Sequence, residues 1–143
     1  MTRGDGSFRV LEPDELGPAR GFSHGMLAPA GGRLLFVAGQ TAAGPDGAVP
    51  VGGFAAQFEG ALRKVLAVVE EAGGRPEHVG RMTVYVTDLE AYRAARSELG
   101  DRWRRLMGRH YPAMALVAVE GLVDDGALVE IEATAVLAEP TQE

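Results

Sequence analysis

Apolar residues recur at three- and four-residue steps in the middle of the chain, beginning at Phe54. The repeat continues through Phe58, Ala61, Leu62, Val65, Leu66, Val69 and Ala72. This spacing places one apolar stripe along a helix. Gly73-Gly74 follows directly, and glycine just after the last helical residue is typical of a helix C-terminus. The pattern predicts a helix over residues 54–72.

A second helical stripe follows between residues 87 and 108. Its apolar members are Leu89, Tyr92, Ala95, Leu99, Trp103 and Leu106. Thr87 and Glu90 have the spacing of a capping box, in which two side chains bond backbone N–H groups at a helix start. Gly108 and Pro112 predict the end of this helix, because neither residue continues a helix easily.

Alternating, β-branched and aromatic residues predict the strands. These strands span residues 8–11, 22–28, 33–38, 78–86, 113–119 and 128–137. Residues 22–28 and 33–38 have the pattern of a hairpin that turns at Gly31-Gly32. The order of elements favours an α+β two-layer sandwich, with a mixed six-stranded sheet and both helices on one face. The other face stays open in a monomer, and its apolar strands predict an oligomer.

Composition narrows the possible classes of function. The 143 residues predict a single domain over residues 1–143, in which residues 1–20 form a loosely ordered strand and loop. The net charge is −6 without a basic stripe, so we expect no nucleic-acid partner. The absence of cysteine excludes thiolate chemistry and disulfides. Without a long apolar run or a secretory signal, we expect no membrane partner and a cytoplasmic protein.

The polar residues offer few catalytic arrangements. Ser23 and His24 are neighbours on a predicted strand, so their side chains point to opposite faces and cannot form a catalytic pair. The three histidines lack the spacing of metal ligands, and we expect neither a metal nor a cofactor. Glu130 and Glu132 share one face of the last strand. An exposed or interfacial sheet face explains Glu132, whereas Glu130 is also a candidate general acid or base.

Five segments together resemble one known family. They are FSHGM…LLFVAGQT, GGFAAQFEGALRKVLAVVEEAGG, VYVTDLEAYRAAR, YPAMALVAV and GALVEIEATAV. In this order and spacing they are similar to the YjgF/RidA family, the reactive intermediate deaminases, over about residues 20–137. The resemblance implies a chorismate-mutase-like fold and a homotrimer with a central barrel of sheets. It also implies small-molecule clefts between subunits, where active members hydrolyse enamines and imines without a cofactor.

The resemblance also implies a ligand site that has lost polar groups. The family holds the substrate carboxylate with an arginine in a Pro-Ala-Arg context, and Met114 occupies that position here. Phe22, Leu116 and Ala38, the last of which precedes Gly39-Gln40, stand where the family often has more polar residues. Glu130 matches the family's catalytic glutamate. The family often has an asparagine where this chain has Arg96, which either supplies a cation to a neighbouring cleft or is a solvated helix residue paired with Glu90 or Asp101.

Three functions remain open. The first is a diverged enzyme in which Glu130 acts on an imine, an enamine or a related intermediate other than the usual 2-imino acid. The second is a non-catalytic trimer that binds an apolar small molecule or a protein partner. The third is the ordinary deaminase, with Arg96 in place of the missing arginine.

Overall fold

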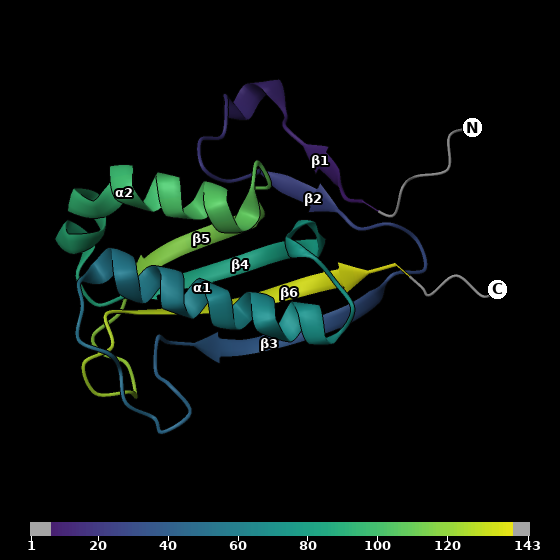
Figure 1. Ribbon diagram of the computed structural model, residues 1–143. Helices are drawn as coiled ribbons and strands as arrows, with labels where there is room; N and C mark the ends of the chain where they lie inside the picture. The colour runs from purple at the N-terminus through teal and green to yellow at the C-terminus, as the bar shows by residue number, and fades with distance from the viewer. Residues whose placement is uncertain (1–6, 139–143) are drawn as a thin grey trace.

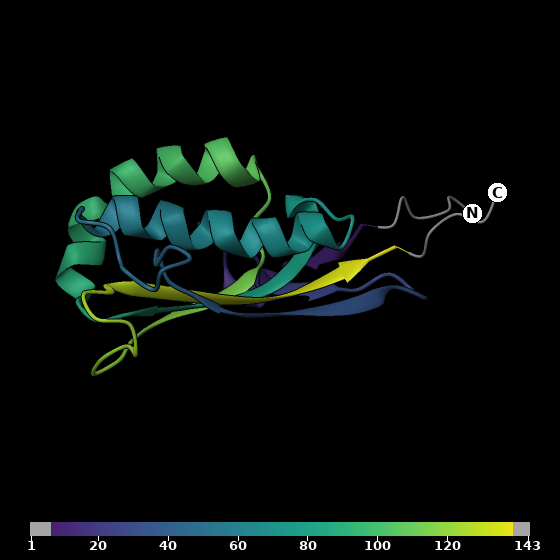
Figure 2. The same cartoon turned by 60° about the horizontal axis from the view of Figure 1, so that its bottom comes forward.

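The computed structural model describes residues 7–138 and shows two layers, a sheet and the pair of helices that covers one of its faces (Figures 1 and 2). The described helices are α1 (Phe54–Glu71) and α2 (Leu89–Met107). The strands are β1 (Arg9–Leu11), β2 (Gly25–Leu27), β3 (Arg33–Gln40), β4 (Val79–Val86), β5 (Ala113–Ala118) and β6 (Val129–Leu137). Single 3-10 turns lie at Asp14–Leu16 and Pro76–His78. The predicted α+β class, with two helices on one face of a mixed sheet, is confirmed.

The main sheet has four strands in the order β3-β6-β4-β5, so the prediction of a single six-stranded sheet is wrong. Strand β6 pairs antiparallel with both β3 and β4, whereas β4 and β5 are parallel. Strands β1 and β2 form a separate antiparallel pair. The predicted hairpin of β2 with β3 does not form, because the chain before β2 lies at the β5 edge and β3 forms the opposite edge. Ser23 makes a parallel bridge to Ala113 of β5.

The core lies between the helices and the sheet. Alternation along β6 turns Val129, Ile131 and Ala133 toward the helices, and Glu130 and Glu132 toward the uncovered face. The described hydrophobic side chains with no exposed surface in this layer are Ala61, Leu62, Val65, Val69, Val79, Met82, Val84, Val86, Val129, Ile131 and Ala135. These residues are the buried faces that the two periodicities predict.

The ends of the helices follow the sequence signals in part. Helix α1 ends at the predicted glycines, where Gly73 has φ of 85° and the Gly74 amide donates to the Val69 carbonyl at 2.9 Å. The predicted capping box at α2 is wrong. Asp88 caps this helix instead, and its Oδ1 accepts from the Glu90 and Ala91 amides at 2.9 and 3.2 Å. Thr87 does not cap the helix. Its amide donates to the Leu128 carbonyl at 3.1 Å, next to the paired ends of β4 and β6.

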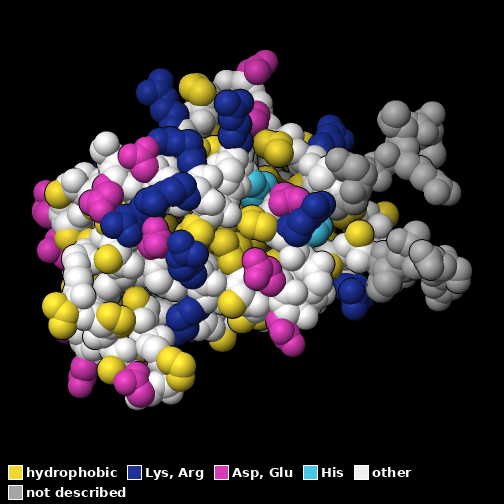
Figure 3. Space-filling model, viewed as in Figure 1, with side chains coloured by type: hydrophobic (Ala, Val, Ile, Leu, Met, Phe, Trp, Pro, Cys, Tyr) yellow, Lys and Arg dark blue, Asp and Glu magenta, His cyan; other side chains and the backbone are white. Residues whose placement is uncertain are grey.

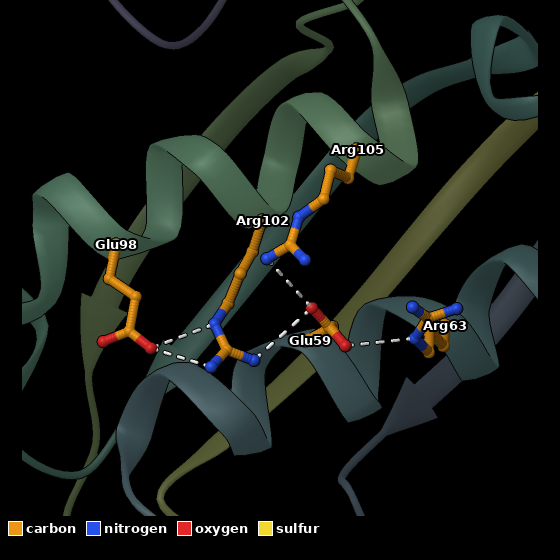
Figure 4. Close-up of polar contacts among 5 residues, drawn as sticks. All are labelled: Glu59, Arg63, Glu98, Arg102 and Arg105. Atoms are coloured by element: carbon orange, nitrogen blue, oxygen red, sulfur yellow. Dashed lines mark hydrogen bonds and ion pairs between the residues drawn. The ribbon is translucent and has the colours of Figure 1, made fainter.

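A cluster of charged residues joins the exposed sides of the two helices (Figure 4). Glu59 of α1 lies 3.2 Å from Arg63, 3.4 Å from Arg102 and 3.9 Å from Arg105. Arg102 also pairs with Glu98 at 2.7 Å. Figure 3 shows these charges interleaved with hydrophobic surface over the helical layer. Contacts of this kind fix the position of α2, although each exposed pair contributes little by itself. Over the described residues, neither helix has the length and hydrophobicity needed to cross a membrane.

Candidate functional site

The uncovered sheet face carries the two glutamates that the sequence singled out. Tyr85 lies opposite Glu130 in the β4–β6 register, and Thr83 lies opposite Glu132. The Tyr85 hydroxyl donates to Glu132 Oε1 at 2.5 Å. This hydrogen bond is the main reason why the pKa of Tyr85 is raised above its usual value. Glu132 is therefore engaged within its own chain, and Glu130 is the glutamate left to act on a ligand.

Glu130 extends over an irregularity in the edge strand β3. Val37 pairs with Ala133 and Gln40 with Ile131, so Ala38 and Gly39 together lie opposite one residue of β6. The Glu130 side chain occupies the space above Gly39, where an added Cβ would come 3.0 Å from Cδ and 3.2 Å from Cγ of the glutamate. The Gln40 side chain donates to the Ala38 carbonyl at 3.2 Å. We call Glu130, Ala38, Gly39 and Gln40 the β3 half-site.

Met114 and Leu116 lie at the other edge of the sheet and face the helices. They pair with the buried residues Met82 and Val84 of β4, so they share the helix-covered face. Together with α2 they border a cleft of about 290 Å³. Its lining residues are Gly21, Phe58, Val84, Tyr92, Arg96, Leu99, Gly100, Trp103, Arg104, Tyr111, Met114 and Leu116. We call this space the α2–β5 cleft.

Arg96 belongs to the α2–β5 cleft of its own chain. Its guanidinium lies 5.6 Å from the centre of the Tyr92 ring. The expected pairing with Glu90 or Asp101 is wrong, because Glu90 pairs with Arg93 and Asp101 pairs with Arg104 at 2.6 Å. Within the described part of the chain, no carboxylate forms an ion pair with Arg96.

Phe22 lies next to the segment that joins the β5 edge. The Ser23 amide donates to the Pro112 carbonyl at 3.1 Å, and Ser23 Oγ donates to the Tyr111 carbonyl at 2.6 Å. The Phe22 ring is 37% exposed and meets the His24 ring edge-on at 5.2 Å. His24 Nε2 lies 3.0 Å from the Gly17 carbonyl, so Ser23 and His24 have separate partners, in keeping with the predicted opposite faces.

The predicted site residues therefore divide between the two edges and the two faces of the sheet. One chain does not by itself assemble the expected pocket of Phe22, Ala38, Met114 and Leu116 around Glu130, which the resemblance places between subunits. Glu130 instead borders a separate hollow of about 320 Å³, together with Tyr85, Glu132 and the loop at residues 121–123. None of the described His, Asp and Glu side chains gather in a group of three that could hold a metal ion.

The four aromatic residues that line the α2–β5 cleft, Phe58, Tyr92, Trp103 and Tyr111, were missing from the predicted site. The Trp103 and Tyr111 rings stack at 5.9 Å with an angle of 7° between their planes, and Tyr92 lies under Arg96. Trp103 and Tyr92 belong to the apolar stripe that predicted α2, so their spacing indicated core packing and carried no separate signal for a ligand. Tyr111 precedes Pro112 and Met114, and this proximity in sequence was the one available indication.

Comparisons with known proteins agree with the sequence resemblance. Residues 12–137 match the family model described as Endoribonuclease L-PSP. A RutC family protein of Pyrococcus horikoshii is 31% identical over 129 residues, which are 90% of this chain and 94% of the relative. The crystal structure of the Rid family protein YyfB from Yersinia pestis has 32% identity and a TM-score of 0.77, covering 92% of this chain and 99% of that one.

A third related protein has a crystal structure that contains a bound ligand. The crystal structure of E. coli TdcF with bound serine has 26% identity and a TM-score of 0.61, and the match covers 84% of this chain and 97% of TdcF. The family model spans nearly all of the described chain, and both the sequence relative and the YyfB structure are matched over almost their whole length. This chain therefore belongs to the YjgF/RidA family.

Proposed function

We propose that the protein is a homotrimer whose small-molecule sites form between subunits, where the β3 half-site of one subunit meets the α2–β5 cleft of the next. The observation that carries this proposal is the division of the site residues between the β3 side and the β5 side of the sheet, whose two outer strands these are. A head-to-tail ring brings opposite edges of neighbouring subunits together. This arrangement would bring Glu130 of one subunit close to Met114, Leu116, Phe22 and Arg96 of its neighbour.

The uncovered sheet face supports an assembly of this kind. Phe36 is 75% exposed and Leu34 is 63% exposed on β3, and Val117 is 43% exposed on β5. Their strand positions place all three on the face opposite the helices. Large apolar side chains gathered on one sheet face favour contact with another protein surface. A trimer with the sheets turned inward, as a central barrel, would cover them.

The chemistry that we propose is hydrolysis or deamination of an imine, an enamine or a related intermediate, assisted by Glu130. The Glu130 carboxylate takes a proton from a water molecule while the oxygen of that water adds to the imine carbon. The same carboxyl group gives this proton to the nitrogen, which completes a carbinolamine, and it then moves the hydroxyl proton of the carbinolamine to the nitrogen as the C–N bond breaks. The C=N bond and water thereby become a C=O bond and ammonia or an amine, and no cofactor takes part.

The usual 2-imino acids are poor candidates for the substrate. Their carboxylate is bound to the reacting carbon, and the family's arginine for that carboxylate is replaced by Met114. A thioether does not replace charge-assisted hydrogen bonds, each of which is worth about 1.5–3 kcal/mol. We therefore propose a different substrate class for this protein. We expect it in the cytoplasm, with neither nucleic acid nor a membrane as partner.

The second candidate function is binding without catalysis. The apolar and aromatic walls of the α2–β5 cleft favour it, because such walls bind an apolar ligand without any reacting group. Under this alternative the trimer binds an apolar small molecule or a protein partner, and Glu130 takes part only in contacts between subunits. Dependence of turnover on Glu130 separates the two functions.

Replacing Glu130 tests the proposed reaction. Imines can be generated by an amine oxidase from amines with no carboxylate on the reacting carbon, and ammonia release gives the rate. We expect the protein to accelerate one or more of these reactions and to leave 2-iminopropionate nearly unaffected. Glu130→Gln should lower the accelerated rate by roughly 10²–10⁴-fold, because the amide cannot transfer the proton.

Glu132→Gln is the matched control for this test, since it changes a neighbouring glutamate that Tyr85 already engages. We expect it to retain most of the rate. Full activity of Glu130→Gln, or fast hydrolysis of 2-iminopropionate by the unsubstituted protein, contradicts the proposed reaction.

Sedimentation tests the proposed trimer independently of any substrate. We expect the unsubstituted chain to sediment as a trimer. Phe36→Glu should dissociate it, because the variant places a charge on the exposed apolar face where subunits would meet. Val51→Glu is the control, since Val51 is fully exposed in a loop away from the sheet. A stable monomer of the unsubstituted protein would refute the intersubunit site.

A further inference from the structure

We propose that the α2–β5 cleft binds a ligand with two parts, a flat apolar body and an anionic group held by Arg96. The proposal deepens the proposed function by naming the ligand class of the same site, and it rests on that function only in treating the cleft as part of the site. The cleft itself lies within one chain. One chain therefore supplies these lining residues, and in the proposed trimer the β3 half-site of the next subunit, with Glu130, would complete the site.

Arg96 is the free cation of the cleft. Arg104 also lines it, but its guanidinium is engaged by Asp101 at 2.6 Å. Arg93, one turn earlier on α2, is engaged by Glu90. None of the twelve lining residues is acidic. Arg96 is therefore a positive charge in the lining that forms no ion pair with a described carboxylate of this chain, and this charge favours an anion.

The remaining walls suit a flat hydrocarbon. Trp103 and Tyr111 stack in parallel, and Leu99 and Val84 are buried beside them. The Trp103 indole N–H donates to the His110 carbonyl at 3.1 Å. Trp103 therefore offers the ligand an apolar surface without a free donor. Aromatic walls favour a ring or a conjugated chain over a saturated polar body. A volume of about 290 Å³ holds a single-ring ligand and lies near the lower limit for small-molecule sites.

Met114 contributes to this preference through its shape. Its unbranched thioether adapts to an irregular apolar ligand and makes favourable contacts with aromatic rings. At the same position an arginine would extend into the cleft from strand β5, whereas Arg96 extends into it from helix α2. The anion of the ligand is thus bound on a different wall. We infer that a ligand of this protein has its anionic group separated from the reacting carbon by the apolar body.

A pair of probes that differ only in charge tests the proposal. Phenylacetate carries the anion and the ring, and phenylacetamide has nearly the same shape without the charge. Binding of both to the full-length protein is measured by calorimetry. Fluorescence gives a second readout, because Trp103 is the single tryptophan of the chain and lines the cleft. We expect phenylacetate to bind about 10-fold more tightly than the amide, as one charge-assisted contact allows.

Arg96→Gln should remove this preference, weakening phenylacetate by about 10-fold and leaving phenylacetamide unchanged. Arg93→Gln is the matched control on the same helix, since Arg93 does not line the cleft, and it should bind both probes as the unsubstituted protein does. Equal affinity for the two probes, undiminished phenylacetate binding by Arg96→Gln, or no saturable binding of either probe at millimolar concentrations would each overturn the proposal.

The binding test and the test of the reaction have independent outcomes. Binding that depends on Arg96, without turnover that depends on Glu130, supports the ligand class and refutes the catalysis. Turnover that depends on Glu130, with phenylacetate binding indifferent to Arg96, supports the catalysis and refutes the ligand class.

Discussion

Met114→Arg is expected to give the protein hydrolysis of 2-iminopropionate at a rate about 10²-fold above that of the unsubstituted chain. The new guanidinium would supply two charge-assisted hydrogen bonds to the substrate carboxylate, each worth about 1.5 kcal/mol or more. Together they amount to about 3 kcal/mol, or two factors of ten at 1.4 kcal/mol each. The rate is measured as ammonia release after an amino-acid oxidase has generated the imine from alanine.

The surroundings of Met114 make this substitution practicable. Its side chain is half-buried and borders the α2–β5 cleft, so the longer arginine can extend into open space. Met114→Leu is the control for shape, because it keeps the position apolar and should gain no activity. Ala115→Arg serves as the control for charge where it remains trimeric, since residue 115 pairs with Thr83 and faces the uncovered side of the sheet, on which subunits would meet. It should also gain none.

The melting temperature and the association state should be checked for all three variants. If Met114→Arg is folded and trimeric but still inactive toward 2-iminopropionate, then residue 114 does not occupy the carboxylate-binding position. If Ala115→Arg gains as much as Met114→Arg, added charge alone explains the effect.

Local patterns in the sequence predicted both helices and the sheet strands well, because each element buries a continuous stripe or an alternating face. The 3.6-residue repeat of α1 and the alternation of β6 are confirmed almost residue by residue. The start of α2 was displaced by one residue. Thr87 and Asp88 are both good capping residues, and the choice between them depends on the hydrogen bond from the Thr87 amide to Leu128, 41 positions further along the chain.

Pairing between strands was predicted less well, since it depends on which edges lie close in space. The segments at β2 and β3 have the composition of a hairpin, yet β2 pairs with β1 and its approach contacts β5. The ion pairs near Arg96 were also predicted wrongly, because they too depend on which groups lie close in space. Five arginines and three acidic residues on α2 allow more than one set of ion pairs, and only the rotamers decide that Arg93 and Arg104 use the nearby carboxylates.

The division of the site between two edges also follows from pairing order alone. Glu130 and Met114 are close in the sequence and lie on strands of one sheet, but β4 separates those strands and the side chains point to opposite faces. Resemblance to a family named the candidate residues and implied clefts between subunits. The assignment of each candidate to one edge and one face of the sheet required the strand order and register.

Gly39→Ala is expected to lower activity by about 10²-fold while leaving the fold nearly unchanged. The new methyl group would occupy the space of the Glu130 side chain, 3.0 Å from its Cδ. The glutamate is the more flexible partner, so its carboxylate should move while the β3 backbone stays. A displacement of the order of 1 Å in a reacting group costs about 10²-fold in rate. The rate can be measured in the Met114→Arg protein or with any imine that the unsubstituted protein hydrolyses.

Gly52→Ala provides the control, because a methyl group there meets only Ala56 at an ordinary contact distance of 3.5 Å. Both alanine variants should melt within a few degrees of the parent protein, and only Gly39→Ala should lose activity. A crystal structure of Gly39→Ala gives a readout that needs no substrate, since it should show Glu130 in another rotamer. An unmoved glutamate with a reduced rate would mean that Gly39 itself contacts the substrate. A moved glutamate with an unchanged rate would remove Glu130 from the reaction, because a proton-transferring group cannot leave its position without consequence.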